Sequence, residues 1–144
     1  MTANEYQREA MRTLNPALDR DAVLLNGVMG LCGEAGEAIN IVKKHLAQGH
    51  PLDREALVRE LGDVAWYLAE TAAALDLDLE TVLRVNLAKL RARYPEGFSA
   101  EQSMHRTRLR RLTNEPQQAT IRAMKCREGD KYPPGFVRER GSGW

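Results

Sequence analysis

Two pairs of acidic residues have a spacing that could hold a metal ion. Glu34 and Glu37 form the first pair, and Glu60 and Asp63 form the second. The members of each pair are three positions apart, so on a helix both carboxylates lie on one face. Four converging carboxylates repel one another unless a cation compensates their charge. The spacing therefore indicates a cation site, provided that the two pairs meet in the fold.

Mg²⁺ is the cation that this set of side chains favours, with Mn²⁺ as the alternative. Mg²⁺ prefers hard oxygen ligands and keeps water and substrate phosphates in its coordination shell. Softer metals would recruit His or Cys, and neither occurs at a matching position in the sequence. The competing interpretation is a solvated acidic helix face. Glu60 argues against it, because its neighbours Leu57 and Leu61 belong to an apolar stripe.

The elements that must position these carboxylates are helices. Apolar residues recur every three or four positions through four segments, and no segment alternates with the period of a strand. We therefore predict an all-α fold, a bundle of about four helices. The predicted helices begin at Thr2, at Asp19 or Asp21, at Asp53 and at Asp78. They end near Thr13, at Gln48, near Leu75 and before Pro95.

The second and third predicted helices form a hairpin that brings the two acidic pairs together. Glu37 lies 11 residues before Gln48, and Asp63 lies 10 residues after Asp53. At about 1.5 Å per residue these two carboxylates reach nearly the same height in an antiparallel hairpin. Glu34 and Glu60 then lie on opposite sides of that level, so all four side chains can converge.

Four glycines recur every third residue inside the second predicted helix, where each costs about 0.5–1 kcal/mol relative to Ala. They are Gly27, Gly30, Gly33 and Gly36. Some gain must offset this cost. The sequence leaves two explanations open, which are close approach of another helix and room for a bulky ligand beside Glu34.

Further residues could contact a nucleotide or another phosphate-containing ligand. Asn86, Lys89 and Arg93 share one face of the fourth predicted helix and could bind phosphate and hydroxyl oxygens. A solvated basic face explains the same spacing. Trp66 and Tyr67 could stack on a base, although core packing is the commoner role for aromatic residues.

Lys43 is the last candidate for the substrate site. It could meet a phosphate, or it could simply complement the dipole at the end of the second predicted helix.

Composition indicates one mildly acidic body with a basic tail. Of the 144 residues, those numbered 1–100 hold 11 Lys or Arg against 15 Asp or Glu, and those numbered 101–144 hold 10 against 5. We therefore expect a catalytic domain over 1–100 and a basic extension over 101–144. The tail supports an alternative function, a nucleic-acid or protein-binding module, with Arg106, Arg108, Arg110 and Arg111 as its basic cluster.

The expected location is the cytoplasm. The chain has only two cysteines, Cys32 and Cys126, and they form no metal-binding or disulfide pattern. The first twelve residues are polar and unlike a signal peptide. No apolar run approaches the roughly 18 residues of a membrane span, so we expect no membrane association.

The acidic pairs and their flanking residues resemble the signature of MazG-like nucleotide pyrophosphohydrolases, in the short single-domain branch of the all-α NTP pyrophosphatase superfamily. The segments that carry the likeness are Gly30–Glu37, Asp63–Leu68 and Asn86–Phe98, with Tyr6–Thr13 ahead of them. It covers about residues 5–100 and does not extend to the tail beyond about residue 103. The family signature often begins with two adjacent acids, and here Gly33 occupies the first position.

The resemblance implies Mg²⁺-dependent hydrolysis of a (deoxy)nucleoside triphosphate to the monophosphate and pyrophosphate, as nucleotide-pool housekeeping. Glu34, Glu37, Glu60 and Asp63 match the metal ligands. Asn86, Lys89 and Arg93 match positions that contact the nucleotide. The resemblance also implies a homodimer or homotetramer in which helices are pooled into bundles. Because of Gly33, the group that activates the attacking water is unassigned.

Overall fold

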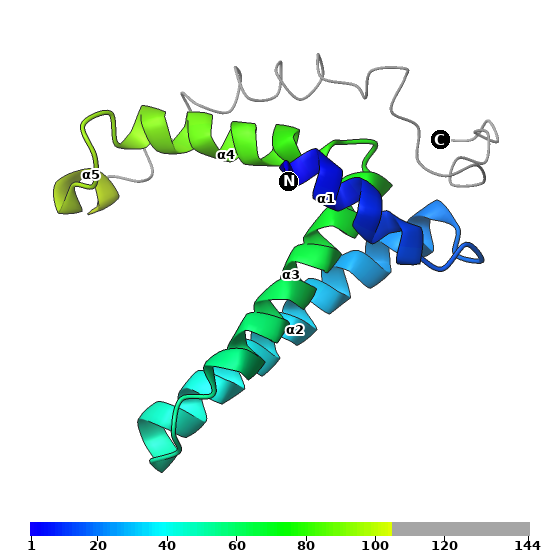
Figure 1. Ribbon diagram of the computed structural model, residues 1–144. Coiled ribbons are helices and arrows are strands. Elements are labelled where there is room, and N and C mark those ends of the chain that lie inside the picture. The colour runs from blue at the N-terminus through cyan, green and yellow to red at the C-terminus, as the bar shows by residue number, and fades with distance from the viewer. Residues whose placement is uncertain (105–144) are drawn as a thin grey trace.

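The computed structural model describes residues 1–104, and their regular structure is entirely helical. Figure 1 shows the arrangement. The elements are α1 (Ala3–Ala10), η1 (Met11–Thr13), α2 (Arg20–Gln48), α3 (Arg54–Ala74), α4 (Leu79–Arg93) and α5 (Ala100–Met104). The all-α prediction is confirmed for this part of the chain. The predicted boundary at residue 100 stays a prediction, and the basic cluster of the tail lies outside the described residues.

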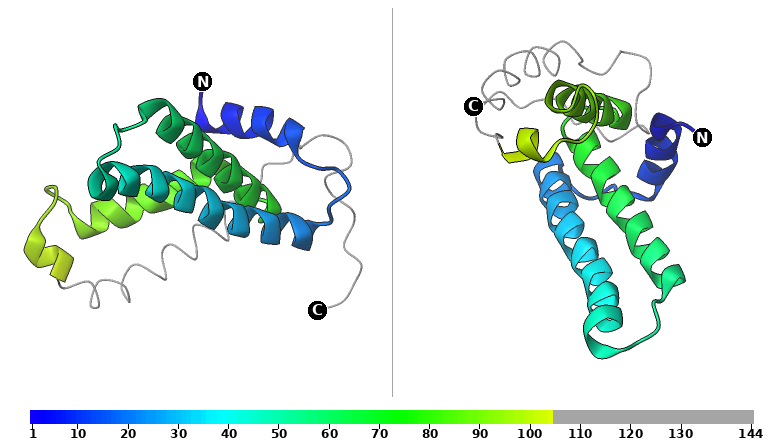
Figure 2. Two further views of the ribbon diagram at one scale, coloured as in Figure 1. Left: turned by 90° about the horizontal axis from the view of Figure 1, so that it is seen from below. Right: turned by 90° about the vertical axis from the view of Figure 1, so that its left-hand side faces the viewer.

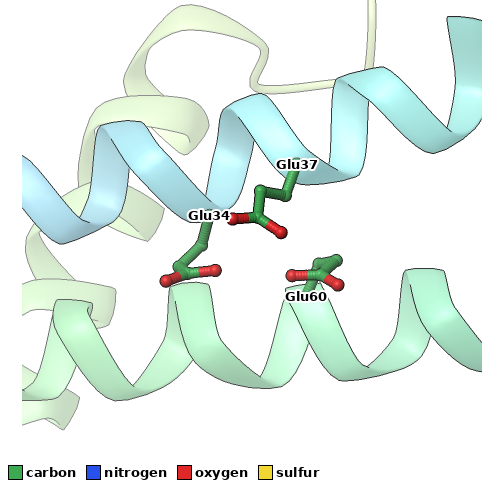
Figure 3. Close-up of side chains that lie close together, drawn as sticks. All are labelled: Glu34, Glu37 and Glu60. Carbon is green, nitrogen blue, oxygen red and sulfur yellow. The ribbon is translucent and has the colours of Figure 1, made fainter.

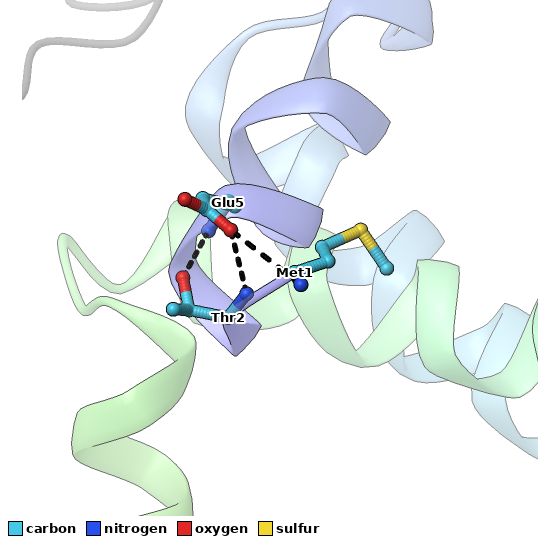
Figure 4. A network of polar contacts seen from close by, with 3 residues as sticks. All are labelled: Met1, Thr2 and Glu5. Carbon is cyan, nitrogen blue, oxygen red and sulfur yellow. Dashed lines mark hydrogen bonds and ion pairs between the residues drawn. The ribbon is translucent and has the colours of Figure 1, made fainter.

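The first helix begins with the capping box expected from the sequence. The Glu5 backbone N–H donates to Thr2 Oγ1 over 3.1 Å, and the Thr2 backbone N–H donates to Glu5 Oε2 over 2.7 Å (Figure 4). The amino group of Met1 lies 3.9 Å from the same carboxylate. These contacts satisfy two backbone donors that a helix start otherwise leaves unpaired.

The other three long helices each begin at an aspartate that acts as N-cap. The side chains of Asp19, Asp53 and Asp78 accept hydrogen bonds from backbone N–H groups three residues later. Gly49 ends α2 in the left-handed conformation, with φ of 73°, which glycine adopts without steric cost. These starts and this stop agree with the sequence prediction.

Helices α2 and α3 form a long antiparallel hairpin, with α1 and the start of α4 at its open end and α5 beyond the far end of α4. Figures 1 and 2 show the two helices side by side over most of their length. Helix α1 packs against α3 at that end, and α4 leaves it in a different direction. The hairpin is therefore the only element pair that can position both acidic pairs within one described chain.

A small core lies where α1, α3 and the start of α4 meet, and Gln7 holds it together. The Gln7 side-chain amide donates to the carbonyl oxygens of Ala69, over 3.2 Å, and Leu77, over 3.1 Å. Its carbonyl oxygen accepts from the backbone N–H of Leu79 over 2.8 Å. The buried apolar residues of this core are Met11, Ala69, Ala73 and Leu79.

The face of α2 that packs against α3 differs from the apolar stripe that dominates its sequence. Four residues of that stripe, which we call the apolar flank, are Val28, Ile39, Val42 and Leu46, and they are 46%, 67%, 36% and 77% exposed. The buried residues of α2 are instead Val23 and Gly27. Small side chains let the two helices approach closely, and this leaves the larger apolar groups on the surface.

By length and composition alone, α2 is apolar enough to cross a membrane. This finding corrects the expectation that no apolar stretch reaches that length. The two carboxylates Glu34 and Glu37 lie near the middle of the helix, where a charge is costly in a bilayer. The exposed large apolar residues of α2 are the four of the apolar flank together with Leu25 and Met29.

Candidate metal centre

Two glycines of α2 set the register of the hairpin. A β-carbon on Gly27 would lie 2.5 Å from Thr71 Oγ1 and 3.1 Å from the Thr71 backbone nitrogen. A β-carbon on Gly30 would overlap the ring of Tyr67. Each further turn along α2 is matched by one turn back along α3. This register places Glu34 opposite α3 one turn before Tyr67, which is the position of Asp63. The heights counted from the hairpin tip pair Asp63 with Glu37 instead, so that prediction is wrong by one helical turn.

Three of the four predicted carboxylates converge in this register. One oxygen from each of Glu34, Glu37 and Glu60 can be chosen so that all three lie within 4.8 Å of one another. Figure 3 shows the two α2 side chains pointing toward α3, where Glu60 meets them. Glu37 is exposed, and the other two are half-buried. The arrangement is compact enough for one cation to contact all three residues.

Asp63 completes the acidic cluster from the next turn of α3. Its charge raises the pKa of Glu34 and also that of Tyr6 in α1, in both cases after the larger effect of burial. It belongs to the same electrostatic site, although its oxygens fall outside the tight group of three. Glu34, Glu37, Glu60 and Asp63 are called the acidic cluster below.

The acidic cluster carries negative charge that no basic side chain of the described residues neutralises. The three ion pairs in this part of the chain all involve other acids. Loss of hydration, followed by the charges of the three neighbouring carboxylates, raises the pKa of Glu34 above its ordinary value. A hydrogen bond with Glu60 acts in the same direction. A bound cation would relieve this repulsion.

The donor set of the acidic cluster fits Mg²⁺ or Mn²⁺. All its ligand atoms are carboxylate oxygens, which hard divalent cations prefer. The nearest histidine on α2, His45, is held through Nδ1 by the carbonyl oxygen of His50 at 2.8 Å and lies near the hairpin tip. Softer metals find no nitrogen ligand at the cluster among residues 1–104.

The two remaining glycines of α2 border the acidic cluster and have open space around them. A β-carbon on Gly33 or Gly36 would meet no atom within 4 Å. Gly33 and Glu37 are four residues apart and thus share one side of the helix, which we call the glycine flank. Close helix approach therefore explains Gly27 and Gly30, and room beside the cluster is the explanation left for the other two.

The basic strip of α4 is not brought to the acidic cluster within one chain. Asn86 is exposed, and Lys89 and Arg93 are half-buried. The Arg93 guanidinium lies over the ring of Tyr94, with 5.9 Å between its carbon and the ring centre. Helix α4 diverges from the hairpin, and this separates these residues from the acidic cluster in the described chain.

The aromatic pair after Asp63 takes part in packing. The Trp66 indole N–H donates to the Ala10 carbonyl oxygen over 3.2 Å and to Thr13 Oγ1 over 2.9 Å, and its ring packs on the core. The ring of Tyr67 lies against Gly30. Trp66 thus has the structural role that the sequence left open as the alternative to base stacking.

Lys43 lies on the other flank of α2 from Glu37. With Ala38, Leu57 and part of the apolar flank it lines a shallow groove between α2 and α3 near the hairpin tip. Its ammonium group is exposed and makes no ion pair within the described chain.

Two features near the acidic cluster were missed by sequence reasoning. The Tyr6 hydroxyl of α1 lies 3.5 Å from the carbonyl oxygen of Gly62, directly beside Asp63, and no spacing in the sequence signals this contact. Glu70 is fully buried further along the hairpin, where the Asn26 amide donates to both of its oxygens over 3.0 Å. Glu70 lies seven residues after Asp63, which is two helical turns and the same face of α3. This spacing is the only feature of the sequence that could have pointed to Glu70.

Comparison with known proteins agrees with this geometry. Residues 25–98 match the MazG nucleotide pyrophosphohydrolase domain. The chain belongs to this MazG family. The matched segment contains the whole acidic cluster and the basic strip of α4. Family membership thus confirms the resemblance read from the sequence.

A curated relative of this MazG domain is known from a bacteriophage. The Gene 37 protein of Mycobacterium phage L5 is 48% identical over 73 residues, which cover 48% of this chain and 64% of that protein. The chain thus spans somewhat less than two thirds of the length of this relative. No solved structure matches the chain. Members of the MazG family use a divalent metal, and the acidic cluster is the candidate site for it.

Proposed function

We propose that the chain hydrolyses a (deoxy)nucleoside triphosphate to the monophosphate and pyrophosphate at a Mg²⁺ site made by Glu34, Glu37, Glu60 and Asp63. One observation carries the proposal: the carboxylate oxygens that converge within 4.8 Å lie inside a MazG domain and have no basic partner in the described chain. A nucleotide brings both a cation and phosphate oxygens, which such a cluster can bind together.

The protein's contribution to the reaction is positioning and charge. Bound Mg²⁺ neutralises phosphate charge and lowers the pKa of a coordinated water. The acidic cluster would hold the cation, and the register of the two helices that carry it is set by Gly27 and Gly30. The open glycine flank leaves room beside the cluster for the triphosphate. Lys89 and Arg93 would stabilise the charge that develops on phosphate oxygens.

A second copy of the chain would complete the site. The apolar flank and the exposed leucines of α4, Leu83, Leu87 and Leu90, leave large apolar groups in water, and such surfaces mark interfaces. Since α4 diverges from its own hairpin, pairing of two chains is the simplest way to bring a basic strip to an acidic cluster. We therefore propose a homodimer or homotetramer. Nucleotide-pool housekeeping in the cytoplasm follows as the proposed role.

The proposal is tested by assaying the purified full chain with a panel of canonical and noncanonical (deoxy)nucleoside triphosphates and Mg²⁺. Chromatography should show equal amounts of monophosphate and pyrophosphate, and EDTA should abolish both. Glu60→Gln should lower turnover by about 100-fold or more, because a lost ligand weakens cation binding and charge stabilisation together.

Glu55→Gln is the matched control, since it makes the same change at an exposed position in the first turn of the same helix. It should keep full turnover. Release of orthophosphate instead of pyrophosphate, or equal turnover by Glu60→Gln and Glu55→Gln, would contradict the proposal.

A further inference from the structure

Helix α1 is fixed against α3 and the start of α4, so its side chains have defined positions beside the hairpin. Asn4 Oδ1 accepts from the backbone N–H of Glu80 over 2.9 Å, and Gln7 makes three buried or partly buried hydrogen bonds. At the other end, Ala10 and Thr13 accept from Trp66. Tyr6 lies between these anchors and packs on the core.

The Tyr6 hydroxyl lies next to the acidic cluster. It donates to the carbonyl oxygen of Gly62 over a long 3.5 Å, and Gly62 directly precedes Asp63. Burial, and second the charge of Asp63, raises the pKa of Tyr6. The hydroxyl thus contacts the backbone directly beside Asp63, and its hydrogen bond is to this carbonyl rather than to a carboxylate of the cluster. Asp63, in turn, accepts no hydrogen bond from a described side chain.

We propose that Tyr6 is a positioning residue, whose hydroxyl donates to the Asp63 carboxylate and orients it as a ligand of the bound cation. The inference rests on the proposed metal site. A phenol O–H can rotate from the weak, neutral contact with Gly62 to a carboxylate oxygen, and hydrogen bonds to ionised acceptors are the stronger kind. Partners of this type fix the orientation of a metal ligand and are worth about 10–100-fold in metal affinity.

The test is Mn²⁺ binding to the full chain, measured by electron paramagnetic resonance of the free ion and without any nucleotide. Tyr6→Phe keeps the ring in the core and removes only the hydroxyl. We expect it to weaken Mn²⁺ binding about 10-fold. Thr13→Val is the matched control, because it removes a hydroxyl from the same junction of α1 with α3 without facing the cluster. It should bind Mn²⁺ like the wild type.

A double-mutant cycle separates positioning from a general effect on the fold. Asp63→Asn should weaken Mn²⁺ binding, and adding Tyr6→Phe should then have little further effect, since both changes remove one interaction. Equal Mn²⁺ affinity of Tyr6→Phe and the wild type, or a full additional loss in the Asp63→Asn background, would overturn the role of Tyr6. A wild-type chain without Mn²⁺ binding would instead overturn the metal site itself.

Discussion

At the scale of single residues, the hairpin contains two acidic environments with different consequences. The acidic cluster is open to solvent on its glycine flank, so a cation and its ligand can enter. Glu70 is closed off, and Asn26 is its hydrogen-bond donor. The open acids can serve chemistry, whereas the closed one affects stability.

Glu70 should make the stability of the fold depend on pH. Burial raises its pKa above the ordinary value of 4.5, and the Asn26 hydrogen bond lowers it by less. At a pH between 4.5 and the raised pKa of the folded state, Glu70 of the folded protein holds a proton that the unfolded chain has released. The free energy of unfolding therefore contains a contribution that is complete below pH 4.5 and is lost as the pH rises through the folded pKa.

Replacing Glu70 with glutamine should remove this contribution. Urea unfolding followed between about pH 4 and pH 8 should show a smaller fall in stability for Glu70→Gln than for the wild type. Both proteins keep Glu34, so its contribution to the comparison cancels. Glu55→Gln, at an exposed site, should follow the wild type. Parallel curves for wild type and Glu70→Gln would contradict the assignment.

At the scale of elements, the sequence predicts where helices begin and end better than which face they bury. The caps at Thr2, Asp19, Asp53 and Asp78 depend on local hydrogen bonds, and local sequence specifies them. The buried face of α2 depends on what α3 presents to it. Glycine has no apolar side chain, so the glycines of the buried face add nothing to the hydrophobic periodicity of the sequence. The periodicity of α2 therefore comes mainly from larger residues such as those of the apolar flank, which are exposed.

The candidate site was predictable for a related reason. The i, i+3 spacing of each acidic pair is a local feature, and the hairpin follows from Gly49 and two N-caps. Tyr6 could not be predicted, because its contact joins residues 56 positions apart and depends on how α1 crosses α3. The same holds for Trp66, whose indole reaches back to η1.

The four glycines of α2 should respond differently to alanine. Gly33→Ala meets open space, so better helix propensity should raise the free energy of unfolding by about 0.5–1 kcal/mol. Gly27→Ala should lower it by about 1–3 kcal/mol, because the new methyl group meets the Thr71 backbone. Thermal and urea unfolding of both variants gives the comparison. A destabilised Gly33→Ala would show that another element covers this glycine.

At the scale of the whole molecule, the described chain leaves much apolar surface uncovered. Its core is small, and two helices carry large exposed apolar residues. Removal of apolar area from water is the main contribution that stabilises a fold. An isolated chain of this kind would bury little apolar area and would gain little stability from burial. Association of two chains through the apolar flank would supply the missing burial.

Charge placed in the apolar flank should therefore break the assembly. Sedimentation of the wild type at micromolar concentration should show a dimer or tetramer, and Ile39→Asp should shift it toward the monomer. Met29→Asp is the matched control on the other side of the same helix, where 65% of the residue is exposed, and should keep the wild-type state. A monomeric wild type, or equal shifts in both variants, would exclude this interface.

Crystals grown with Mn²⁺ and a non-hydrolysable deoxynucleoside triphosphate would show whether the acidic cluster holds a divalent cation. Anomalous difference density should show Mn²⁺ between α2 and α3, with oxygen atoms of Glu34, Glu37, Glu60 and Asp63 among its ligands and phosphate oxygens completing the shell. Density for the ion at another position, or nucleotide bound with no ion at these carboxylates, would contradict the account.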